Sequence, residues 1–279
     1  ALAAQDHANL VGSGRSPVPS SVVHIGTSGW QYRHWRGTFY PRKLAQRSWL
    51  EHYSARFETA EVNNTFYNLP AASVFKQWAE RTPEEFVFSL KVSRFLTHVR
   101  RLRDPEEPVH LFLERARELG RKRGPSLIQL PPQMKVDVGR LDAVLAAFPG
   151  SDRVAVEFRH DSWFTAEVRS VLERRGAALC LVDRQGMRTP RWVTGGWGYV
   201  RFHQGRGRPP SCYGPAALAT WARLLDELWR NDEDVFVYFN NDAFGCALRD
   251  AIRMSRLLAG RGLKVSRVPP AGDVTLSAP

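Results

Sequence analysis

Ionisable side chains stand at the ends of otherwise apolar runs in this sequence. The run VAVEFRHDSWF, residues 154–164, places Glu157 and Arg159 among Val and Phe residues typical of a buried strand. A carboxylate can transfer protons, and a guanidinium can grip phosphate or carboxylate through two parallel hydrogen bonds. Charges at the end of a core strand add nothing to stability unless they are well paired, so they favour a binding or catalytic site.

Four residues at such positions are candidates for proton transfer. They are three carboxylates and one histidine: Glu61, Glu157, Asp183 and His203. Nearby cations would lower the pKa of a carboxylate, whereas histidine titrates near neutrality. His203 is therefore the favoured catalytic residue. Glu157 or Glu61 would be its proton partner, and Asp183 would orient one of them.

Cations and neutral polar groups follow the same pattern and are candidates for substrate binding. Lys91, Arg159 and Arg201 suit an anionic group such as phosphate. The other candidates are polar or aromatic residues at or just after the ends of the runs: Thr27, Ser28, Trp30, Tyr32, Asn63, His98, Gln129, Asn240 and Asn241. For Trp30 and Tyr32 the alternative is packing of a loop. The segment QGRGR, residues 204–208, is a further candidate for holding phosphate.

The four proton-transfer candidates could also ligate a divalent metal such as Mg²⁺, Mn²⁺ or Zn²⁺. Three cations at the same run ends oppose a divalent ion, and a single histidine is few for a zinc cluster. We therefore assign no metal ligand and no cofactor, and we leave a divalent metal as the open alternative.

The elements that must position these residues are of two alternating kinds. Short runs rich in Val, Ile and Phe predict strands at 22–29, 59–66, 86–93, 126–132, 154–160, 178–183, 198–204 and 235–242. Longer amphipathic stretches predict helices at 48–57, 71–81, 106–120, 140–148, 165–176, 215–230 and 243–260. This alternation predicts an α/β fold with a parallel sheet, and eight units in about 240 residues match a (β/α)8 TIM barrel.

One crossover breaks the pattern. The segment RQGMRTPRWVTGG, residues 184–196, has Gly and Pro where a helix is expected, so the crossover between strands 6 and 7 is predicted to be irregular. We expect a flexible N-terminal arm at residues 1–20, a single barrel domain at 21–262 and a C-terminal tail at 263–279. The alternative is an open doubly wound sheet, but no GxGxxG follows the first strand.

A barrel would bring the polar run ends together, because the carboxyl ends of its strands form the catalytic face. Residues two apart in a strand face the same way. Three pairs would then face one mouth: Glu61 with Asn63, Glu157 with Arg159, and Arg201 with His203. The alternative is a self-paired ion network that is neutral and inert.

Composition limits the partners and the location. The formal net charge of the 279 residues is +12, which allows nucleic acid as a partner, but only six of the 40 basic residues are Lys. Such an Arg bias can also reflect codon composition. No run approaches the ~20 apolar residues of a membrane helix, so no membrane partner is expected. Cys180, Cys212 and Cys246 lack CxxC spacing, which predicts a reducing, cytoplasmic location without a disulfide framework. The sequence indicates no oligomeric state.

Several motifs, in order along the chain, resemble one known family. They are GTSGWQYRHWRGTFYP (26–41), EVNNTFYNLP (61–70), FSLKVSRFLTHVRRL (88–102), QLPP (129–132), VEFRHDSW (156–163), YVRFH (199–203) and VYFNND (237–242). This set resembles the YecE-like family, also called domain of unknown function 72 (DUF72). The resemblance implies a TIM-type barrel but no activity, because the family name states that none is established. Gln204 departs from the commoner family pattern, in which Gly follows directly after the position of His203.

These observations predict a hydrolase-type enzyme that acts on a phosphate-bearing or other anionic substrate, with nucleic acid as one candidate. The alternative is a non-catalytic binding protein for an anionic ligand or nucleic acid. An enzyme should lose turnover when a catalytic carboxylate is replaced, whereas a binding protein should keep its affinity.

Overall fold

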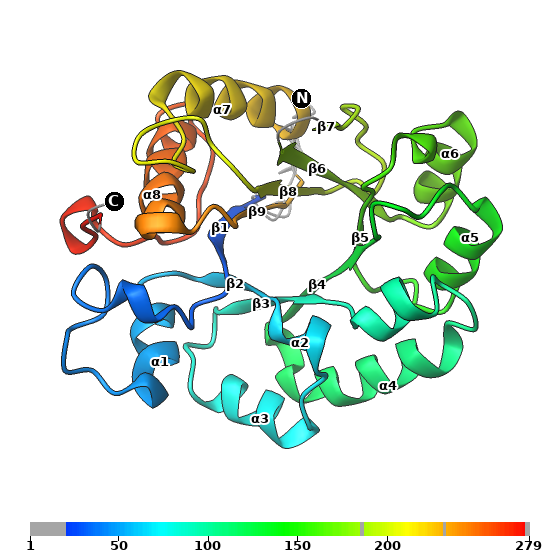
Figure 1. Cartoon of the computed structure of the whole chain (residues 1–279), viewed down its shortest axis with the longest axis horizontal. Coiled ribbons are helices and arrows are strands. Elements are labelled where there is room, and N and C mark those ends of the chain that lie inside the picture. Colours follow the sequence, from blue (N-terminus) through cyan, green and yellow to red (C-terminus); the bar gives the residue numbers. More distant parts are fainter. Residues whose placement is uncertain (1–20, 185–186, 231–232, 277–279) are drawn as a thin grey trace, which may run out of the picture.

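Eight parallel strands form a closed barrel in the computed structural model, which describes residues 21–184, 187–230 and 233–276. The strands are β1 (Val23–Ser28), β2 (Thr59–Val62), β3 (Val87–Lys91), β4 (Arg123–Gln129), β5 (Val154–Glu157), β6 (Ala178–Arg184), β8 (Gly198–Phe202) and β9 (Val235–Phe239). Each pairs with its neighbour in the order β5-β4-β3-β2-β1-β9-β8-β6, and pairing of β5 with β6 closes the ring (Figure 1). The prediction of a (β/α)8 TIM barrel is confirmed.

Helices surround the barrel and cover the outer face of the strands, except for the short helix after β2, which lies over the carboxyl end of the barrel (Figure 1). They are α1 (Trp49–Ser54), α2 (Asn64–Tyr67), α3 (Ala72–Glu80), α4 (Glu106–Ala116), α5 (Val138–Ala146), α6 (Ala166–Arg174), α7 (Pro215–Trp229) and α8 (Cys246–Ala259). In α5, Leu141, Val144 and Leu145 are buried, which is the spacing of one helix face. Asp137 caps this helix by accepting a hydrogen bond from the Arg140 amide (3.0 Å).

The crossover between β6 and β8 is irregular, as predicted. A two-residue strand, β7 (Met187–Arg188), pairs antiparallel with the end of β6. The described residues from 187 to 197 contain no helix. Gly and Pro in this segment account for the missing helix.

The strands are buried on both faces, and alternate residues point to different environments. In β5 and just after it, Val154, Val156 and Phe158 pack in the main core between strands and helices. Ala155 packs in the separate cluster inside the barrel, and Glu157 follows it by two residues on the same face. The two-residue period therefore turns Glu157 and Arg159 toward the barrel axis.

One predicted strand boundary is wrong. The second strand was predicted to continue to residue 66, but β2 ends at Val62 and the short helix α2 follows. The described part of the predicted C-terminal tail, residues 263–276, contacts the barrel. There the Val23 amide donates to the Lys264 carbonyl and the Ile25 amide donates to Ser266 Oγ, both at 2.9 Å. The predicted N-terminal arm, residues 1–20, lies outside the described residues.

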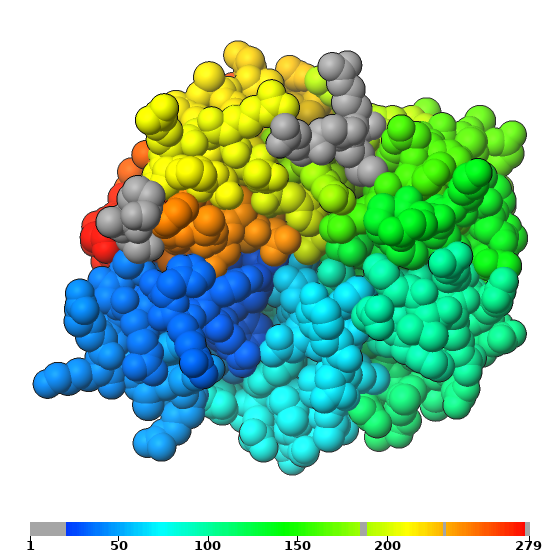
Figure 2. Space-filling view, in the orientation of Figure 1, coloured from blue at the N-terminus to red at the C-terminus, as the bar shows by residue number. Residues whose placement is uncertain are grey.

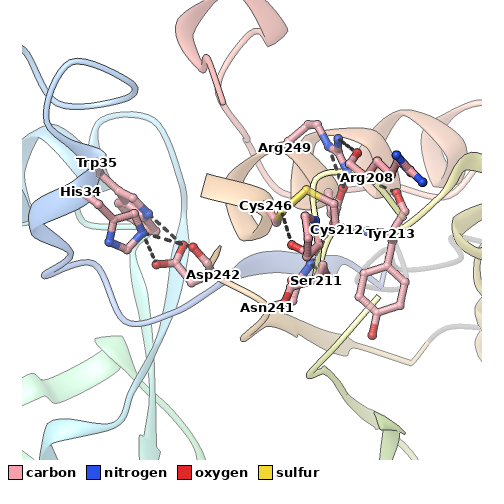
Figure 3. Close-up of a disulfide and its surroundings, with 12 residues drawn as sticks. His34, Trp35, Arg208, Ser211, Cys212, Tyr213, Asn241, Asp242, Cys246 and Arg249 are labelled. Atoms are coloured by element: carbon pink, nitrogen blue, oxygen red, sulfur yellow. Dashed lines mark hydrogen bonds and ion pairs between the residues drawn. A yellow bond between two sulfur atoms is a disulfide. The ribbon is translucent and has the colours of Figure 1, made fainter. Parts of the chain in front are cut away.

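The cysteine prediction is also wrong in part, because Cys212 and Cys246 form a disulfide. It joins the loop after β8 to the first residue of α8 (Figure 3). The two cysteines are 34 residues apart, a separation that no short cysteine motif reveals. Cys180 is free and buried in the barrel. Among the described residues, no helix is long and apolar enough to cross a membrane.

Candidate functional site

A buried cluster of three charged residues lies inside the barrel near the carboxyl ends of the strands. The Arg201 guanidinium donates to Glu61 Oε1 at 2.7 Å and to Glu157 Oε2 at 2.5 Å. Each of these side chains is at most 1% exposed. The cluster joins β2, β5 and β8 across the barrel axis, and it confirms that these strand ends converge.

Neighbouring groups satisfy the remaining oxygens of both carboxylates. Arg159 Nε donates to Glu157 Oε1 (2.8 Å), and the Tyr199 hydroxyl donates to Glu61 Oε2 (2.8 Å). Burial alone would raise the pKa of each carboxyl, but the Arg201 guanidinium holds the pKa of Glu61 below its usual value and that of Glu157 well below it. Both carboxylates are therefore ionised and fully paired, which makes them poor proton acceptors.

His203 lies among three polar neighbours. Asn240 Nδ2 lies 3.1 Å from its Nδ1, and Glu157 Oε1 lies 3.6 Å from its Nε2. The Arg201 guanidinium lies 3.4 Å from the same Nε2, so both ring nitrogens face polar groups of the cluster or of Asn240. Burial lowers the pKa of His203 although Glu157 opposes this effect, so the ring is neutral. His203 positions the cluster, and the prediction that it handles substrate protons is not supported by this geometry.

A pocket of about 550 Å³ opens above the buried cluster. It is lined by Tyr32, Asn63, Phe66, Tyr67, Lys91, Arg94, His98, Gln129, Arg159, Arg201 and Asn240. We call it the mouth pocket. The segments after β1, β2 and β3 and those near β9 meet at the centre of this face (Figure 2). Four of the lining residues are cations and none is acidic. The carboxylates of Glu61 and Glu157, both bound to Arg201, lie beneath the pocket.

Lys91 is a buried cation of this pocket for which no anionic partner is found among the described residues. Its side chain is 8% exposed, and its Nζ lies 4.1 Å above the ring of Phe66. No hydrogen bond or ion pair of Nζ is found among the described residues. Burial lowers the pKa of Lys91 to about 8, and Arg201 adds to this effect, whereas Glu61 and Glu157 oppose it. A desolvated ammonium without a counter-ion is available to a bound anion.

His98 lies on a π-helix (Phe95–Val99) after β3 and lines the same pocket. Thr97 Oγ1 donates its hydrogen to the Ser93 carbonyl (3.2 Å), so it accepts from His98 Nδ1 at 2.9 Å. That bond leaves Nε2 with a lone pair. Burial lowers the pKa of His98 to about 4, with contributions from the charges of Lys91, Arg94 and Arg159, so the ring is neutral.

Three predicted site residues point away from the mouth. Thr27 faces α1, where its amide donates to the Tyr53 hydroxyl (3.0 Å). Asp183 accepts from Trp221 Nε1 of α7 at 2.7 Å. Asn241 donates to Asp250 Oδ2 of α8 (2.8 Å) and to the Ser211 carbonyl (2.9 Å). The expectation that Asp183 orients a catalytic carboxylate is therefore wrong.

The other predicted residues lie at or beside the mouth. Gln129 accepts hydrogen bonds from Arg159 (2.9 Å) and Arg201 (3.2 Å). Trp30 packs edge-on against Trp78 with 5.6 Å between ring centroids, so the packing alternative holds for most of its surface. Asn63 and Tyr32 line the mouth pocket directly.

The predicted phosphate loop at residues 204–208 does not offer its glycine amides. The Gly205 amide donates to the Ser211 carbonyl (2.9 Å), and the Gly207 amide donates to the Cys212 carbonyl (2.7 Å). Figure 3 shows this loop held near the disulfide and α8. The two amides close the loop on itself, so they are not available to hold phosphate.

Three lining residues were not predicted: Phe66, Tyr67 and Arg94. Phe66 and Tyr67 belong to α2, which the sequence pattern merged into the preceding strand. Arg94 precedes the π-helix, and no sequence period indicates which way a residue in such a turn points. Their only sequence signal is a position just after a strand end.

The residues present do not fit a metal centre. Among the described residues, no group of three or more His, Cys, Asp or Glu side chains is arranged to hold a metal ion. Of the four candidate ligands, Glu61 and Glu157 are bound to guanidinium groups, and Asp183 faces α7. A divalent cation would have to displace Arg201 from both carboxylates.

Comparison with known proteins adds a family and a fold. A family model described as "Protein of unknown function DUF72" matches residues 24–273. The UPF0759 protein YunF of Bacillus subtilis is 27% identical over 278 residues, which cover 85% of this chain and 95% of YunF. The UPF0759 protein YecE of Escherichia coli K12 is 29% identical over 176 residues, 61% of this chain and 62% of YecE.

Solved structures of similar proteins share the barrel. A DUF72 family protein from Thermotoga maritima has a TM-score of 0.76 and 29% identity, over 85% of this chain and 99% of that one. A DUF72 family protein from Enterococcus faecalis has a TM-score of 0.72 and 20% identity, over 85% of this chain and 96% of that one. The second likeness concerns the fold alone, and neither description states an activity.

Proposed function

The chain belongs to the DUF72 family of proteins of unknown function, and we propose that it is an enzyme that hydrolyses a phosphate-bearing or similarly anionic substrate at the mouth of its barrel. The observation that carries the proposal is the unpaired ammonium of Lys91 in a pocket lined by cations. The carboxyl end of the strands is also where the active sites of such barrels lie.

The charges around the mouth pocket do not cancel. Lys91, Arg94, Arg159 and Arg201 face two carboxylates, both of which are bound to guanidinium groups. In a self-paired network each cation would be bound to a carboxylate. Among the described residues, no carboxylate is bound to Lys91 or Arg94, so these two can bind a ligand. Because the pocket is partly desolvated, an anion there interacts with these groups more strongly than it would in water. A phosphate also offers the oxygens that Lys and Arg side chains bind.

Hydrolysis requires a group that takes a proton from the attacking water. His98 fits this role because its ring is neutral and its Nε2 lone pair is free. In the proposed step the water oxygen bonds to phosphorus, its proton passes to Nε2, and the bond from phosphorus to the leaving oxygen breaks. The leaving oxygen takes a proton, for which the Lys91 ammonium is the candidate acid. A bound anion raises the pKa of His98 by offsetting the cations that depress it.

The first test is binding of inorganic phosphate, measured by calorimetry and by the shift in melting temperature. We expect Lys91→Met to weaken phosphate binding about ten-fold or more, which corresponds to the loss of one charge-assisted hydrogen bond. Lys76→Met is the matched control, because Lys76 is exposed on α3 outside the barrel. Equal affinities of the wild type and the Lys91→Met variant would refute the anion site.

Turnover of phosphate monoesters and diesters tests the catalytic role separately. We expect His98→Gln to keep phosphate binding within a few-fold and to lower the hydrolysis rate by about 10²-fold or more, because it removes only the base. Phosphate binding without turnover of any ester by the wild type would favour the other candidate, a non-catalytic protein that binds anions. The pairing of both buried carboxylates is the observation that favours that candidate.

A further inference from the structure

A second, smaller pocket adjoins the mouth pocket. Its volume is about 170 Å³, and it is formed by the segments that follow β1 and β2. Tyr32 and Asn63 line both pockets, so the two are neighbours. We call the smaller one the side pocket. One ligand can therefore occupy both.

The side pocket contains a buried polar atom without a partner, on Asn63, and a buried hydroxyl, that of Ser28, whose neighbour is the Glu61 carboxylate. Asn63 Oδ1 makes no hydrogen bond. The hydroxyl of Ser28, which is 1% exposed and lies beside the Glu61 carboxylate, makes none of standard geometry either. Buried polar atoms in folded proteins nearly always have a partner. A ligand with hydroxyl groups would supply a donor to Asn63 and either a donor or an acceptor to Ser28.

The lining of the side pocket is neutral, in contrast to that of the mouth pocket. It includes the amides of Gln31, Asn63 and Asn64, the Ser28 hydroxyl and the aromatic side chains of Trp30 and Tyr32. None of these groups is ionised at neutral pH, since burial raises the pKa of Tyr32 above its ordinary value. Amides and hydroxyls suit a group that carries several hydroxyls.

From these features we infer that the side pocket binds the sugar part of a phosphorylated sugar whose phosphate lies in the mouth pocket. The inference rests on the proposed function, because it takes the anion site as given and names the class of substrate. At roughly 30 Å³ per water molecule, the side pocket has the volume of five or six waters, which is the scale of one sugar ring.

A nucleobase fits this pocket less well than a sugar. Stacking requires the open face of an aromatic ring. Trp30 is only 3% exposed and packs edge-on against Trp78 and Phe88. Tyr32 is fixed by its hydroxyl, which donates to the Ser28 carbonyl at 2.5 Å. Contacts from hydroxyl groups to the amide side chains do not need such a face.

Calorimetry with four kinds of probe tests the inference: inorganic phosphate, a set of pentose and hexose phosphates, the free sugars, and adenosine monophosphate. We expect at least one sugar phosphate to bind about ten-fold more tightly than inorganic phosphate, and the free sugars to bind weakly or not at all. Asn63→Ala and Ser28→Ala should each remove most of that gain. Ser28 lines the side pocket and not the mouth pocket, so Ser28→Ala should also leave phosphate affinity within a few-fold. Asn68→Ala is the matched control, because Asn68 is exposed on the same segment outside the pocket.

The outcomes separate the two proposals. If phosphate binds and no sugar phosphate binds more tightly, the sugar subsite is refuted and the anion site stands. Adenosine monophosphate is the probe for the other occupant. If it is the tightest ligand of the set and Asn63→Ala removes its gain over inorganic phosphate, the side pocket binds a nucleoside, and the inference is refuted. If neither phosphate nor any phosphorylated probe binds, the proposed function itself fails.

Discussion

Single residues in the mouth differ in whether their charge is already neutralised. Arg201 is buried between Glu61 and Glu157, and the three stabilise one another. Lys91 has no such partner, so its charge is a cost to the folded state that a ligand would relieve. His98 is kept neutral by the same surrounding cations. We assign function to Lys91, which lacks a counter-ion among the described residues, and to His98, whose Nε2 keeps a lone pair.

The buried ammonium of Lys91 predicts an unusual stability profile. Its pKa falls from 10.5 to about 8 on folding, so the unfolded chain binds more protons between these values and the unfolding free energy rises with pH there. Lys91→Met removes this cost. We expect it to raise the unfolding free energy at pH 7 by up to about 3 kcal/mol, with the gain shrinking toward pH 10.

The same titration should control ligand binding in the wild type. Phosphate affinity should fall as pH rises through about 8, because Lys91 loses the charge that binds the anion. Thermal unfolding and calorimetry from pH 6 to 10 measure both effects. A Lys91→Met variant that is less stable than the wild type at pH 7 would show that Lys91 has a structural partner.

Arg201 should behave in the opposite way, because its removal leaves two buried carboxylates without a counter-charge. We expect Arg201→Met to lower the unfolding free energy by about 3–5 kcal/mol at pH 7. Burial would then raise the pKa of Glu61 and Glu157, so the variant should become more stable between pH 7 and pH 5 as these groups bind protons.

The wild type should not gain stability on acidification in this way. The folded pKa values of Glu61 and Glu157 lie below their ordinary values, so the stability these groups contribute is present above about pH 4.5 and is lost at lower pH. Arg81→Met is the control, because its pair with Glu51 is exposed and should contribute at most about 1 kcal/mol. Chemical denaturation at pH 5 and 7 provides the comparison. If the unfolding free energy of Arg201→Met has the same pH dependence as that of the wild type, Arg201 does not neutralise the two buried carboxylates.

At the scale of elements, the alternation of side-chain direction along a strand accounts for what the sequence could and could not predict. Glu157 and Arg159 are two apart, and they do face the axis together. Thr27 and Ser28 were both assigned to the mouth, as were Asn240 and Asn241, although adjacent strand residues must face opposite sides. In each pair one residue points outward, Thr27 to α1 and Asn241 to α8.

The remaining differences arise where chain geometry leaves the regular periods. Asp183 lies at the end of β6, but its side chain points away from the barrel axis and contacts Trp221 of α7. The pairing of β6 with β8 fixes this orientation. Arg94 lies beside a π-helix, whose turn is not encoded in any residue spacing. The Cys212–Cys246 bond depends on the approach of the β8 loop to α8, which is a tertiary contact.

The disulfide gives a prediction for the loop after β8. Closing a loop between cysteines 34 residues apart should stabilise the chain by about 3–4 kcal/mol in the chain-entropy model. We expect a reductant to lower the melting temperature of the wild type and to have little effect on a Cys212→Ala/Cys246→Ala variant. Thiol titration of the unfolded, unreduced protein should find one thiol, that of Cys180. Three thiols would show that the bond is not formed.

At the scale of the whole molecule, the net charge of +12 attracts anions independently of the proposed anion site in the mouth pocket. Many surface Arg residues are already paired with carboxylates, as in Arg123 with Asp152 and Arg175 with Asp142. The excess charge is spread over the surface and interacts weakly with any one small ligand, since ions at physiological salt screen it within about 8 Å. A polyanion such as nucleic acid meets many of these charges at once.

This difference predicts how oligonucleotides should bind. We expect weak affinity that falls steeply with salt and that Lys91→Met leaves unchanged within two-fold, because the spread charge provides it. Phosphate at the mouth should depend on Lys91 and respond less to salt, because that pocket is partly buried. Fluorescence anisotropy of a labelled single strand between 50 and 300 mM salt, measured for the wild type, Lys91→Met and the Lys76→Met control, tests this prediction. If Lys91→Met alone abolishes oligonucleotide binding, nucleic acid occupies the mouth and becomes the substrate candidate in place of a small phosphate ester.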